Sequence, residues 1–525
     1  MPRPLAFPVC LATVFACASP PSVAPARAPA PATTAPRDGT PIVQTDHGPL
    51  AGKVVEGGVR AFLGIPYAAP PTGALRWRPP VDAEPWSTPR DAKLVGAACP
   101  QLGPPDYARV NEDCLTLNVW APATGAANKP VLVWIPGGAF VEGSGGFRLY
   151  DGARLAARED AVVVTMNYRV GPLGFLAHRE LARELGRDVS PSYGILDQRA
   201  ALQWVQRNAA VFGGDPADVT LFGESAGAWS VCVHLAMPGS RGLFARAIME
   251  SGACADPLYF GPHEAEAQGD RLATALGCRD LPCLRSKDAD AVIRALPVKR
   301  GFILTPGVWW APVVDGTELP AVPLEALRSG RGANVPLLIG WNRDEGVAHT
   351  ARFDAVTPAE RDGFVRDSFG DAAVGPAAER YTRASVKAAL TDIVTDGAFA
   401  CESRRVARVL VSQGVPVFLY EFTHALESSK LHALGATHSV ELWFVFGTEE
   451  AGIGLADDER PLSHTIMDAW GRFARTGDPA AAALRWPRYT VTGDELAVLD
   501  TAPSTAAHVK SGDCDFWDRF ERPLR

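Results

Sequence analysis

A serine hydroxyl lies between two glycines in the segment GESAG, residues 223–227. A serine is a weak nucleophile unless a nearby base removes its proton, so the meaning of the segment depends on its surroundings. The apolar run VTLF enters it and an apolar helix-like stretch follows directly. Such a sharp strand–turn–helix exposes the hydroxyl at the carboxyl end of a strand, where side chains at 223 and 227 would collide with backbone. We predict that Ser225 is a nucleophile; the alternative is an ordinary turn serine.

Donors for a developing oxyanion are the second requirement of acyl transfer. The segment IPGGAF, residues 135–140, follows another apolar run and lets Gly138 and Ala139 direct backbone N–H groups inward. The N–H of Ala226, directly after the serine, is the third predicted donor. Losing one such donor lowers a rate by about 10²–10³. The alternative for the glycine pair is a simple tight turn.

The elements that must position these residues are short apolar runs separated by helical segments. Near-continuous β-branched runs are typical of strands covered on both faces, and strand–helix alternation favours a parallel sheet. We therefore predict an α/β fold with a large, mostly parallel central sheet, helices on both faces and a cap or flanking insertion at 354–400. The predicted strands are 131–138, 161–169, 218–225, 245–252, 335–342 and 415–422.

The N-terminus has the pattern of an export signal. Residues 1–17 contain Arg3 and a short apolar core, too short to span a bilayer as a helix. Two cleavage patterns fit: a bacterial lipoprotein site that leaves a lipid on Cys17, or ordinary cleavage near Ala16 or Ala18. Residues 18–39 form a Pro/Ala-rich tether, and 40–525 form one catalytic domain. We expect a secreted, periplasmic or outer-membrane-anchored protein.

The chain resembles the type-B carboxylesterase/lipase family, which includes cholinesterases, and looks like a secreted bacterial member. The segments FGGDPADVTLFGESAG (212–227) and EDCLTLNVWAP (112–122) resemble its two signatures, and the similarity covers roughly 41–520. The resemblance implies the α/β-hydrolase fold and a serine esterase with the order serine, acid, histidine along the chain.

The same resemblance selects the partners of the serine. LIGWNRDEG (338–346) implies Glu345 as the acid, with Asp344 as its rival. GATHSVELWFVFG (435–447) implies His438 as the base, and only this segment match separates it from His432 and His424. Family members often carry a carboxylate beside the nucleophile. Glu224 is therefore either an electrostatic support or part of a structural ion pair.

Export permits disulfides, and eight cysteines follow the predicted signal. The resemblance implies three pairs, and we expect the two remaining cysteines to pair with each other. The family pairs are Cys99–Cys114, Cys278–Cys283 and Cys401–Cys514, and the remaining pair is Cys232–Cys254.

The predicted function is hydrolysis of small-molecule carboxylic esters to acid and alcohol through an acyl-enzyme on Ser225. Two alternatives stay open: an inactive adhesion or binding relative, and an amide or lactone hydrolase with the same triad. We expect no metal and no cofactor. The net charge of −8 disfavours a nucleic-acid partner, and the only expected membrane contact is a lipid on Cys17. The first disulfide loop lacks the Trp of cholinesterases, which disfavours choline esters. Trp309 and Trp310 either line the acyl pocket or fill core.

Overall fold

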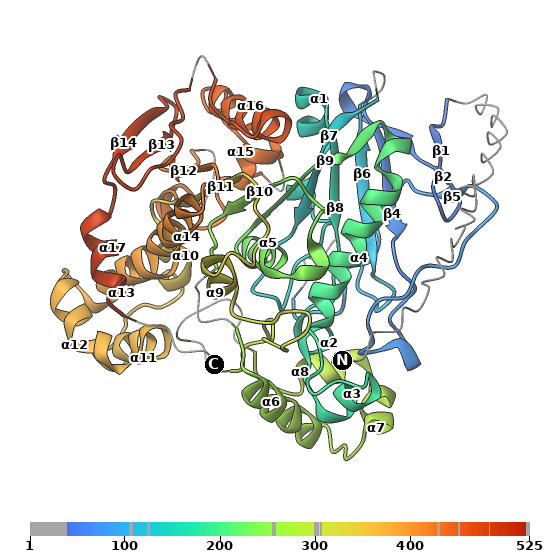
Figure 1. The fold of residues 1–525 in the computed structure, drawn as a ribbon, viewed down its shortest axis with the longest axis horizontal. Helices are drawn as coiled ribbons and strands as arrows, with labels where there is room; N and C mark the ends of the chain where they lie inside the picture. Colours follow the sequence, from blue (N-terminus) through green and yellow to red (C-terminus); the bar gives the residue numbers. More distant parts are fainter. Residues whose placement is uncertain are drawn as a thin grey trace, which may run out of the picture.

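One large β-sheet runs through the molecule and carries the predicted buried strands (Figure 1). The computed structural model describes residues 39–103, 109–122, 127–254, 259–298, 304, 307–427, 431–449, 452–481 and 484–520. The predicted signal, Cys17 and nearly all of the tether lie outside the described residues.

Eleven strands form this sheet, and three short ones form a separate sheet near the N-terminal end of the described chain. The six predicted strands are confirmed, each shorter or shifted by a few residues. In spatial order the large sheet contains β14 (Ser504–Ala507), β13 (Glu495–Leu499), β12 (Val417–Phe422), β11 (Leu337–Asn342), β10 (Arg246–Glu250), β9 (Gly214–Glu224), β7 (Lys129–Ile135), β8 (Val162–Met166), β6 (Thr116–Ala121), β4 (Arg60–Pro66) and β3 (Lys53–Val54). The small sheet contains β1 (Ile42–Gln44), β2 (Pro49–Ala51) and β5 (Arg90–Asp91).

The centre of the large sheet is parallel, as predicted, and its borders are antiparallel. Every neighbouring pair from β8 through β13 is parallel, whereas β14, β6, β4 and β3 join antiparallel. The sequence prediction did not include these border strands. β3 and β14 are short and partly exposed, whereas β6 is buried along its whole length and the prediction missed it.

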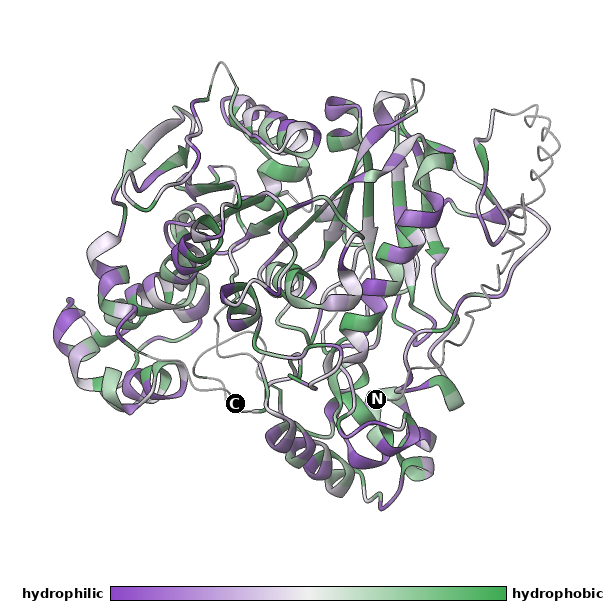
Figure 2. Ribbon diagram, viewed as in Figure 1, coloured by the Kyte–Doolittle hydropathy of each residue, from purple (hydrophilic) through white to green (hydrophobic). Residues whose placement is uncertain are grey.

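Both faces of the parallel strands are buried, which explains their continuous apolar runs. In β7, Val131 and Val133 belong to one hydrophobic core, whereas Leu132 and Trp134 belong to the other. Successive side chains of a strand point to opposite faces, so one strand contributes to two cores. Figure 2 shows much green on the central strands, whereas the peripheral helix α6 (Pro262–Ala275) carries purple.

Helices cover both faces, as the sequence predicts. The helices α4 (Tyr193–Asn208), α5 (Ala226–Ala236) and α14 (Cys401–Ser412) pack on one face, and α16 (Arg460–Thr476) packs on the other with α1 (Ala153–Glu159) and α15 (Leu442–Phe446). The predicted flank forms α11 (Pro358–Phe369), α12 (Asp371–Arg380), α13 (Val386–Val394) and a π-helical segment at Thr395–Ala400, beside α17 (Ser511–Trp517). The remaining helices are α2 (Gly171–Phe175), α3 (Arg179–Glu184), α7 (Leu281–Ser286), α8 (Ala289–Arg294), α9 (Pro323–Arg328) and α10 (Glu345–Thr350).

The strand register brings the ends of β7, β9, β10 and β11 to one edge of the sheet. Ile135 pairs with Gly223, Glu224 with Glu250, and Glu250 with Gly340. Loops that follow neighbouring parallel strands meet at this carboxyl edge, where ligands bind in open α/β sheets. The candidate residues therefore come together although they are far apart in the sequence.

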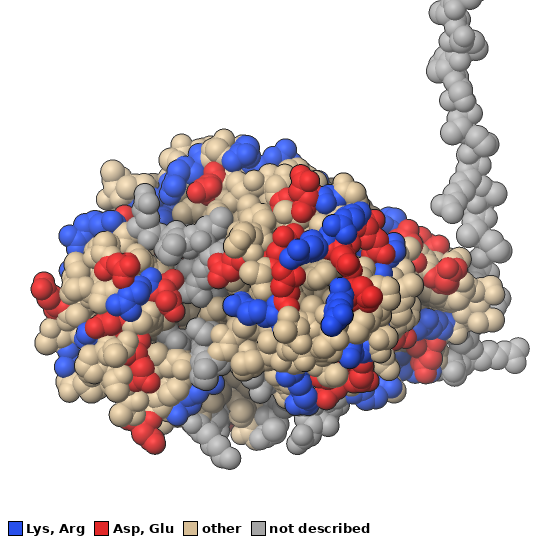
Figure 3. Space-filling model, turned by 90° about the horizontal axis from the view of Figure 1, so that it is seen from below, with Lys and Arg blue, Asp and Glu red and all other residues tan. Residues whose placement is uncertain are grey.

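Acidic and basic side chains are interspersed on the face of the molecule seen in Figure 3. Ion pairs elsewhere on the surface of the described chain include Arg158 with Asp468 at 2.6 Å and Arg366 with Asp371 at 2.7 Å. Exposed pairs of this kind contribute about 0–1 kcal/mol each to stability. Such surface pairs therefore add little to the stability of the fold. The charges around the site, described below, are buried.

Candidate active site

Ser225 occupies the turn between β9 and α5 in a strained backbone conformation. Its φ and ψ are 54° and −122°, a combination that a non-glycine residue adopts only when its surroundings impose it. A Cβ on Gly227 would lie 2.1 Å from the carbonyl oxygen of Ile135, and one on Gly223 would lie 2.6 Å from the carbonyl carbon of Gly227. Both glycines are therefore sterically required, as the sequence predicts.

His438 and Glu345 form a buried pair next to this turn. Nδ1 of His438 lies 2.6 Å from Oε2 of Glu345, and the backbone N–H of Asn342 donates to Oε1 of Glu345 at 2.8 Å. The rival Asp344 instead accepts from the backbone N–H of Ala436 at 2.9 Å. Of the two neighbouring carboxylates, Glu345 is the one that contacts the imidazole.

The other side of the imidazole faces Glu224. Nε2 of His438 lies 3.1 Å from Oε1 of Glu224, and the hydroxyl of Ser439 donates to that same oxygen at 2.5 Å. Burial would lower the pKa of His438, but the carboxylates of Glu224 and Glu345 raise it to about 9. Glu224 is thus beside Ser225 in the chain and in contact with His438 in space.

Two further carboxylates lie behind Glu224, and the sequence did not point to either. Burial, together with nearby carboxylates, raises the pKa of Glu441 well above its usual value. Burial raises the pKa of Glu250 to about 8, although Trp470 donates a hydrogen bond to it at 2.8 Å. Glu441 accepts from the hydroxyl of Ser251 at 3.2 Å. One signal was available: the two neighbouring strands β9 and β10 both end in a glutamate.

Two further rings, those of His349 and Phe399, lie beside the imidazole of His438. The ring centroid of His438 lies 5.0 Å from that of His349 and 5.0 Å from that of Phe399, and the latter two stack at 5.4 Å. Burial and the neighbouring His438 hold the pKa of His349 well below its usual value. A neutral ring at this position does not repel a protonated His438. The sequence carried no signal for this contact, because α10 and the π-helical segment supply the two partners.

The predicted oxyanion loop approaches the serine closely. A Cβ on Gly137 would lie 2.8 Å from the carbonyl oxygen of Glu224 and 3.2 Å from Cβ of Ser225. Gly138 and Ala139 both have positive φ, 113° and 53°, which bends the loop around the end of β7. On the other side, Ala226 begins α5, and the first N–H groups of a helix have no acceptor within that helix. All three predicted donors therefore lie around Ser225.

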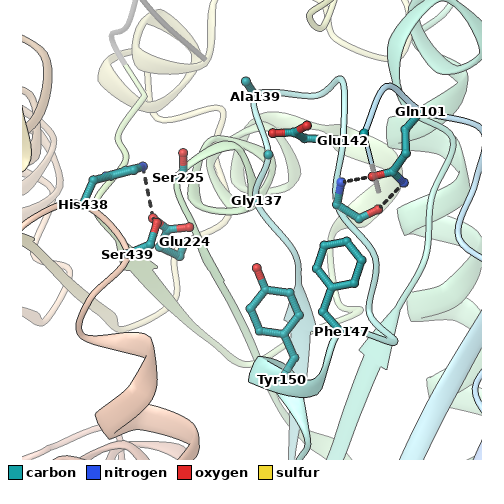
Figure 4. A pocket seen from close by; sticks show the side chains of 13 residues that line it. Gln101, Gly137, Ala139, Glu142, Phe147, Tyr150, Glu224, Ser225, His438 and Ser439 are labelled. Atoms are coloured by element: carbon teal, nitrogen blue, oxygen red, sulfur yellow. Dashed lines mark hydrogen bonds and ion pairs between the residues drawn. The ribbon is translucent and has the colours of Figure 1, made fainter. Parts of the chain in front are cut away.

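Ser225, His438 and the loop with Gly138 and Ala139 line one cavity of about 410 Å³. Figure 4 shows Ser225 between His438 on one side and the loop with Gly137 and Ala139 on the other. The lining residues are Gln101, Gly103, Gly137, Gly138, Ala139, Glu142, Gly143, Phe147, Tyr150, Glu224, Ser225, His438 and Ser439. A cavity of this size admits a small organic molecule.

Neither alternative histidine lines this cavity. His424 lies 2.8 Å from Glu459 and 3.0 Å from Asp500 and is held by that pair of carboxylates, and His432 lies in a short 3₁₀ turn. Trp310 is buried in the core, and Trp309 is half-buried against that core rather than in the wall of the cavity.

The structure contains the four expected disulfides. One bond ties α5, directly after the turn of Ser225, to the segment after β10. The pairs are Cys99–Cys114, Cys232–Cys254, Cys278–Cys283 and Cys401–Cys514.

The described part of the chain has neither a metal-binding cluster nor a membrane-spanning helix. Within it, no group of three or more His, Cys, Asp or Glu side chains is arranged to hold a metal ion. No helix there is both long enough and apolar enough to cross a membrane.

Comparisons with known proteins agree with this geometry. The sequence profile of the Carboxylesterase family matches residues 39–517. The para-nitrobenzyl esterase of Bacillus subtilis (strain 168) is 37% identical over 479 residues, which cover 88% of this chain and 95% of that protein. The fumonisin B1 esterase of Sphingopyxis macrogoltabida is 36% identical over 480 residues, covering 86% of this chain and 85% of that protein.

Solved structures of PNB esterases have the same fold. One superimposes with a TM-score of 0.81 at 36% identity, and a thermophilic PNB esterase does so with 0.81 at 35%. Each comparison covers 91% of this chain and 99% of the other. The chain therefore belongs to the carboxylesterase family, has the α/β-hydrolase fold and hydrolyses carboxylic esters.

Proposed function

We propose that Ser225 attacks the ester carbonyl, that His438 transfers the proton, and that Glu345 orients the imidazole. The observation that carries this assignment is the position of His438, which contacts Glu345 at 2.6 Å through Nδ1 and faces the cavity of Ser225. A hydrogen-bonded acid on one ring nitrogen leaves the other nitrogen to act as the base.

The reaction has two halves. Oγ of Ser225 forms a bond to the carbonyl carbon while its proton passes to Nε2 of His438. The carbonyl oxygen becomes an oxyanion, which the N–H groups of Gly138, Ala139 and Ala226 stabilise. The tetrahedral intermediate collapses, the C–O bond to the alcohol breaks, and His438 returns the proton to the leaving oxygen. Water then repeats these steps on the acyl-enzyme and releases the acid.

Glu224 lies close enough to His438 to stabilise the imidazolium within the site. His438 becomes cationic when it accepts the serine proton, and a carboxylate 3.1 Å from Nε2 stabilises that cation. The same contact competes with the serine for Nε2 before substrate binds. We therefore assign Glu224 as a positioning residue that also sets the pH range of the enzyme.

We propose that the substrate is a small carboxylic ester. The names of two relatives, para-nitrobenzyl esterase and fumonisin B1 esterase, point to different substrates within this family. With no Lys or Arg among the described residues that line the cavity, we do not assign a nucleic-acid or phosphate ligand to it.

We also propose that the chain is exported and works as one catalytic domain, residues 40–525. The apolar core and cleavage pattern of residues 1–17 support export, as do four disulfides, which persist in oxidising compartments. Whether Cys17 carries a lipid is tested by the mass of the mature N-terminus in the wild type and in Cys17→Ser. A lipid mass in the wild type alone assigns the anchor, and its absence in both assigns ordinary cleavage.

The catalytic assignment is tested by the substitution Ser225→Ala. Hydrolysis of p-nitrophenyl acetate should fall by at least about 10³-fold, because no other group of the site supplies the attacking oxygen. The matched control is Ser329→Ala, which removes an exposed hydroxyl directly after α9 and should keep wild-type turnover. Wild-type turnover by folded Ser225→Ala would move the nucleophile elsewhere.

A further inference from the structure

We propose that Gln101 positions the loop that carries two of the oxyanion donors, Gly138 and Ala139. The reaction described above leaves this side chain unused, although it lines the cavity of Ser225. The inference rests on the proposed function, because it concerns the donors that act on the oxyanion formed by Ser225.

The directions of these two donors are set by the carbonyl groups that precede them. A trans peptide is planar, so the N–H of Gly138 points away from the carbonyl of Gly137, and that of Ala139 points away from the carbonyl of Gly138. The carbonyl oxygen of Gly138 accepts from two backbone N–H groups of the segment 141–143, both at 3.0 Å. A Cβ on Gly143 would lie 2.2 Å from the carbonyl oxygen of Gly137. Both carbonyls therefore face this segment, and both donor N–H groups point away from it.

Gln101 anchors the same segment to the first disulfide. The backbone N–H of Gly143 donates to Oε1 of Gln101 at 2.9 Å, and Nε2 of Gln101 donates to the carbonyl oxygen of Gly143 at 3.0 Å. Figure 4 shows both of these hydrogen bonds at the Gln101 amide. Nε2 also donates to the carbonyl oxygen of Cys99 at 3.0 Å, and Cys99 is bonded to Cys114.

Gly143 transmits this anchor to the oxyanion loop. Its φ is +116°, and a side chain there would collide with the carbonyl of Gly137, so the position requires glycine. The backbone of Gly143 contacts both the Gln101 amide and the Gly137 carbonyl. A shift of Gly143 therefore shifts the peptide that carries the N–H of Gly138.

The Gln101 amide has no N–H group left for a substrate. Its side chain belongs to a residue that is only 4% exposed, and its two N–H groups are taken by the carbonyls of Cys99 and Gly143. Buried amides need such partners, so the folded chain holds this arrangement. Gln101 is therefore a positioning residue and not a catalytic one.

A second buried amide holds the next part of the loop independently of Gln101. Oδ1 of Asn167 accepts from the hydroxyl of Ser144 at 2.8 Å and from the backbone N–H of Gly145 at 2.9 Å. Nδ2 of Asn167 donates to the carbonyl oxygen of Cys114 at 3.1 Å. Removing the Gln101 amide should therefore loosen the segment 141–143 while the rest of the loop stays in place.

The test compares two ketones in the wild type and in Gln101→Met, which keeps the length of the side chain and removes its amide. The carbonyl carbon of 1,1,1-trifluoro-4-phenylbutan-2-one forms a bond to Oγ of Ser225, the serine proton passes to His438, and the carbonyl oxygen becomes an oxyanion beside the donors. The methyl ketone 4-phenylbutan-2-one has the same skeleton and binds without forming a stable adduct. The measured quantities are the two inhibition constants, their ratio, and kcat/KM for p-nitrophenyl acetate.

In Gln101→Met the inhibition constant of the trifluoromethyl ketone should rise about 10–100-fold, since misdirected donors cost less than a lost donor, which costs about 10²–10³. The value of kcat/KM should fall by the same factor, because the adduct and the transition state use the same donors. The inhibition constant of the methyl ketone should stay within about twofold, because this ligand forms no oxyanion. A purely structural loss would lower the melting temperature without changing the ratio of the two constants.

The matched control is Gln206→Met, on α4 and outside the described lining of the cavity. Nε2 of Gln206 also donates to two carbonyl oxygens, those of Pro216 at 2.7 Å and Leu243 at 3.0 Å. The same chemical change at this position should keep the wild-type ratio of the two constants.

A folded Gln101→Met variant with the wild-type ratio would overturn the inference. An equal rise of both inhibition constants would also overturn it, because the substitution would then have changed the cavity rather than the donors. If Gln101→Met fails to fold, Gln101→Leu is the second variant, and its ratio is read in the same way. Failure of the wild type to bind the trifluoromethyl ketone more tightly than the methyl ketone would instead overturn the proposed function.

Discussion

Replacing Glu224 by Gln should move the pH profile of the enzyme toward acid. The carboxylate lies 3.1 Å from Nε2 of His438, and with Glu345 it raises the pKa of His438 to about 9. At pH 7 only about one molecule in a hundred then has the neutral imidazole that can accept the serine proton. The acid limb of kcat/KM, which reports the free enzyme, should therefore lie well above pH 7 in the wild type.

The size of the shift follows from the distance. Two unit charges about 4 Å apart at an effective dielectric constant of about 20 interact by about 4 kcal/mol, which corresponds to roughly three pKa units. This value is an upper limit, because burial disfavours the charged form of Glu224 and raises its pKa. In Glu224→Gln the pKa of His438 should fall by about one to three units, and the acid limb should move down by the same amount.

The assay is kcat/KM for a neutral p-nitrophenyl ester between pH 5 and 10, with each variant corrected for stability at each pH. The position of the limb is independent of any loss of maximal rate that the substitution causes. Glu325→Gln is the control for a change of net charge and should leave the limb in place. A wild-type limb at or below pH 6.5, or an unshifted limb in Glu224→Gln, would refute the proposed electrostatic role of Glu224.

Two further substitutions test the roles of Glu345 and Glu250. Glu345→Gln should lower kcat by several orders of magnitude while Asp344→Asn keeps most of it, since of these two carboxylates Glu345 is the one that contacts His438; the reverse pattern would move the acid. Glu250→Gln should raise the free energy of unfolding at pH 8 by about 1–4 kcal/mol and change it little at pH 4.5. The folded-state pKa of Glu250 is raised from 4.5 to about 8, so the stability present below pH 4.5 is lost as the pH rises through 8. Melting curves at both values check this, and an equal gain at the two values would contradict it.

The sequence was sufficient to predict those parts of the fold that rest on local pattern. The buried strands β7 to β12 have continuous apolar runs because both of their faces are covered. The glycines at 223 and 227 have a steric reason that follows from the tightness of a strand–turn–helix. In the folded chain, a Cβ at position 227 would lie only 2.1 Å from a backbone oxygen.

The parts that local pattern could not predict depend on contacts between distant segments. Glu250 and Glu441 are far apart in the sequence, and the effect of Glu224 on the pKa of each follows from the strand register and from the position of α15. His349 and Phe399 reach His438 from α10 and the π-helical segment. Gln101 carries no local signal at all, because its role is to hold the loop of Gly143 from the far side of the cavity.

Covalent labelling of the native protein tests the central assignment most directly. A fluorophosphonate probe should add one adduct per chain, and the reduced tryptic peptide 208–241 should carry it. That peptide also contains Ser230 and Ser240, so fragment ions must place the adduct, and we predict Ser225. Labelling of another residue, or stoichiometric labelling of Ser225→Ala, would contradict the account.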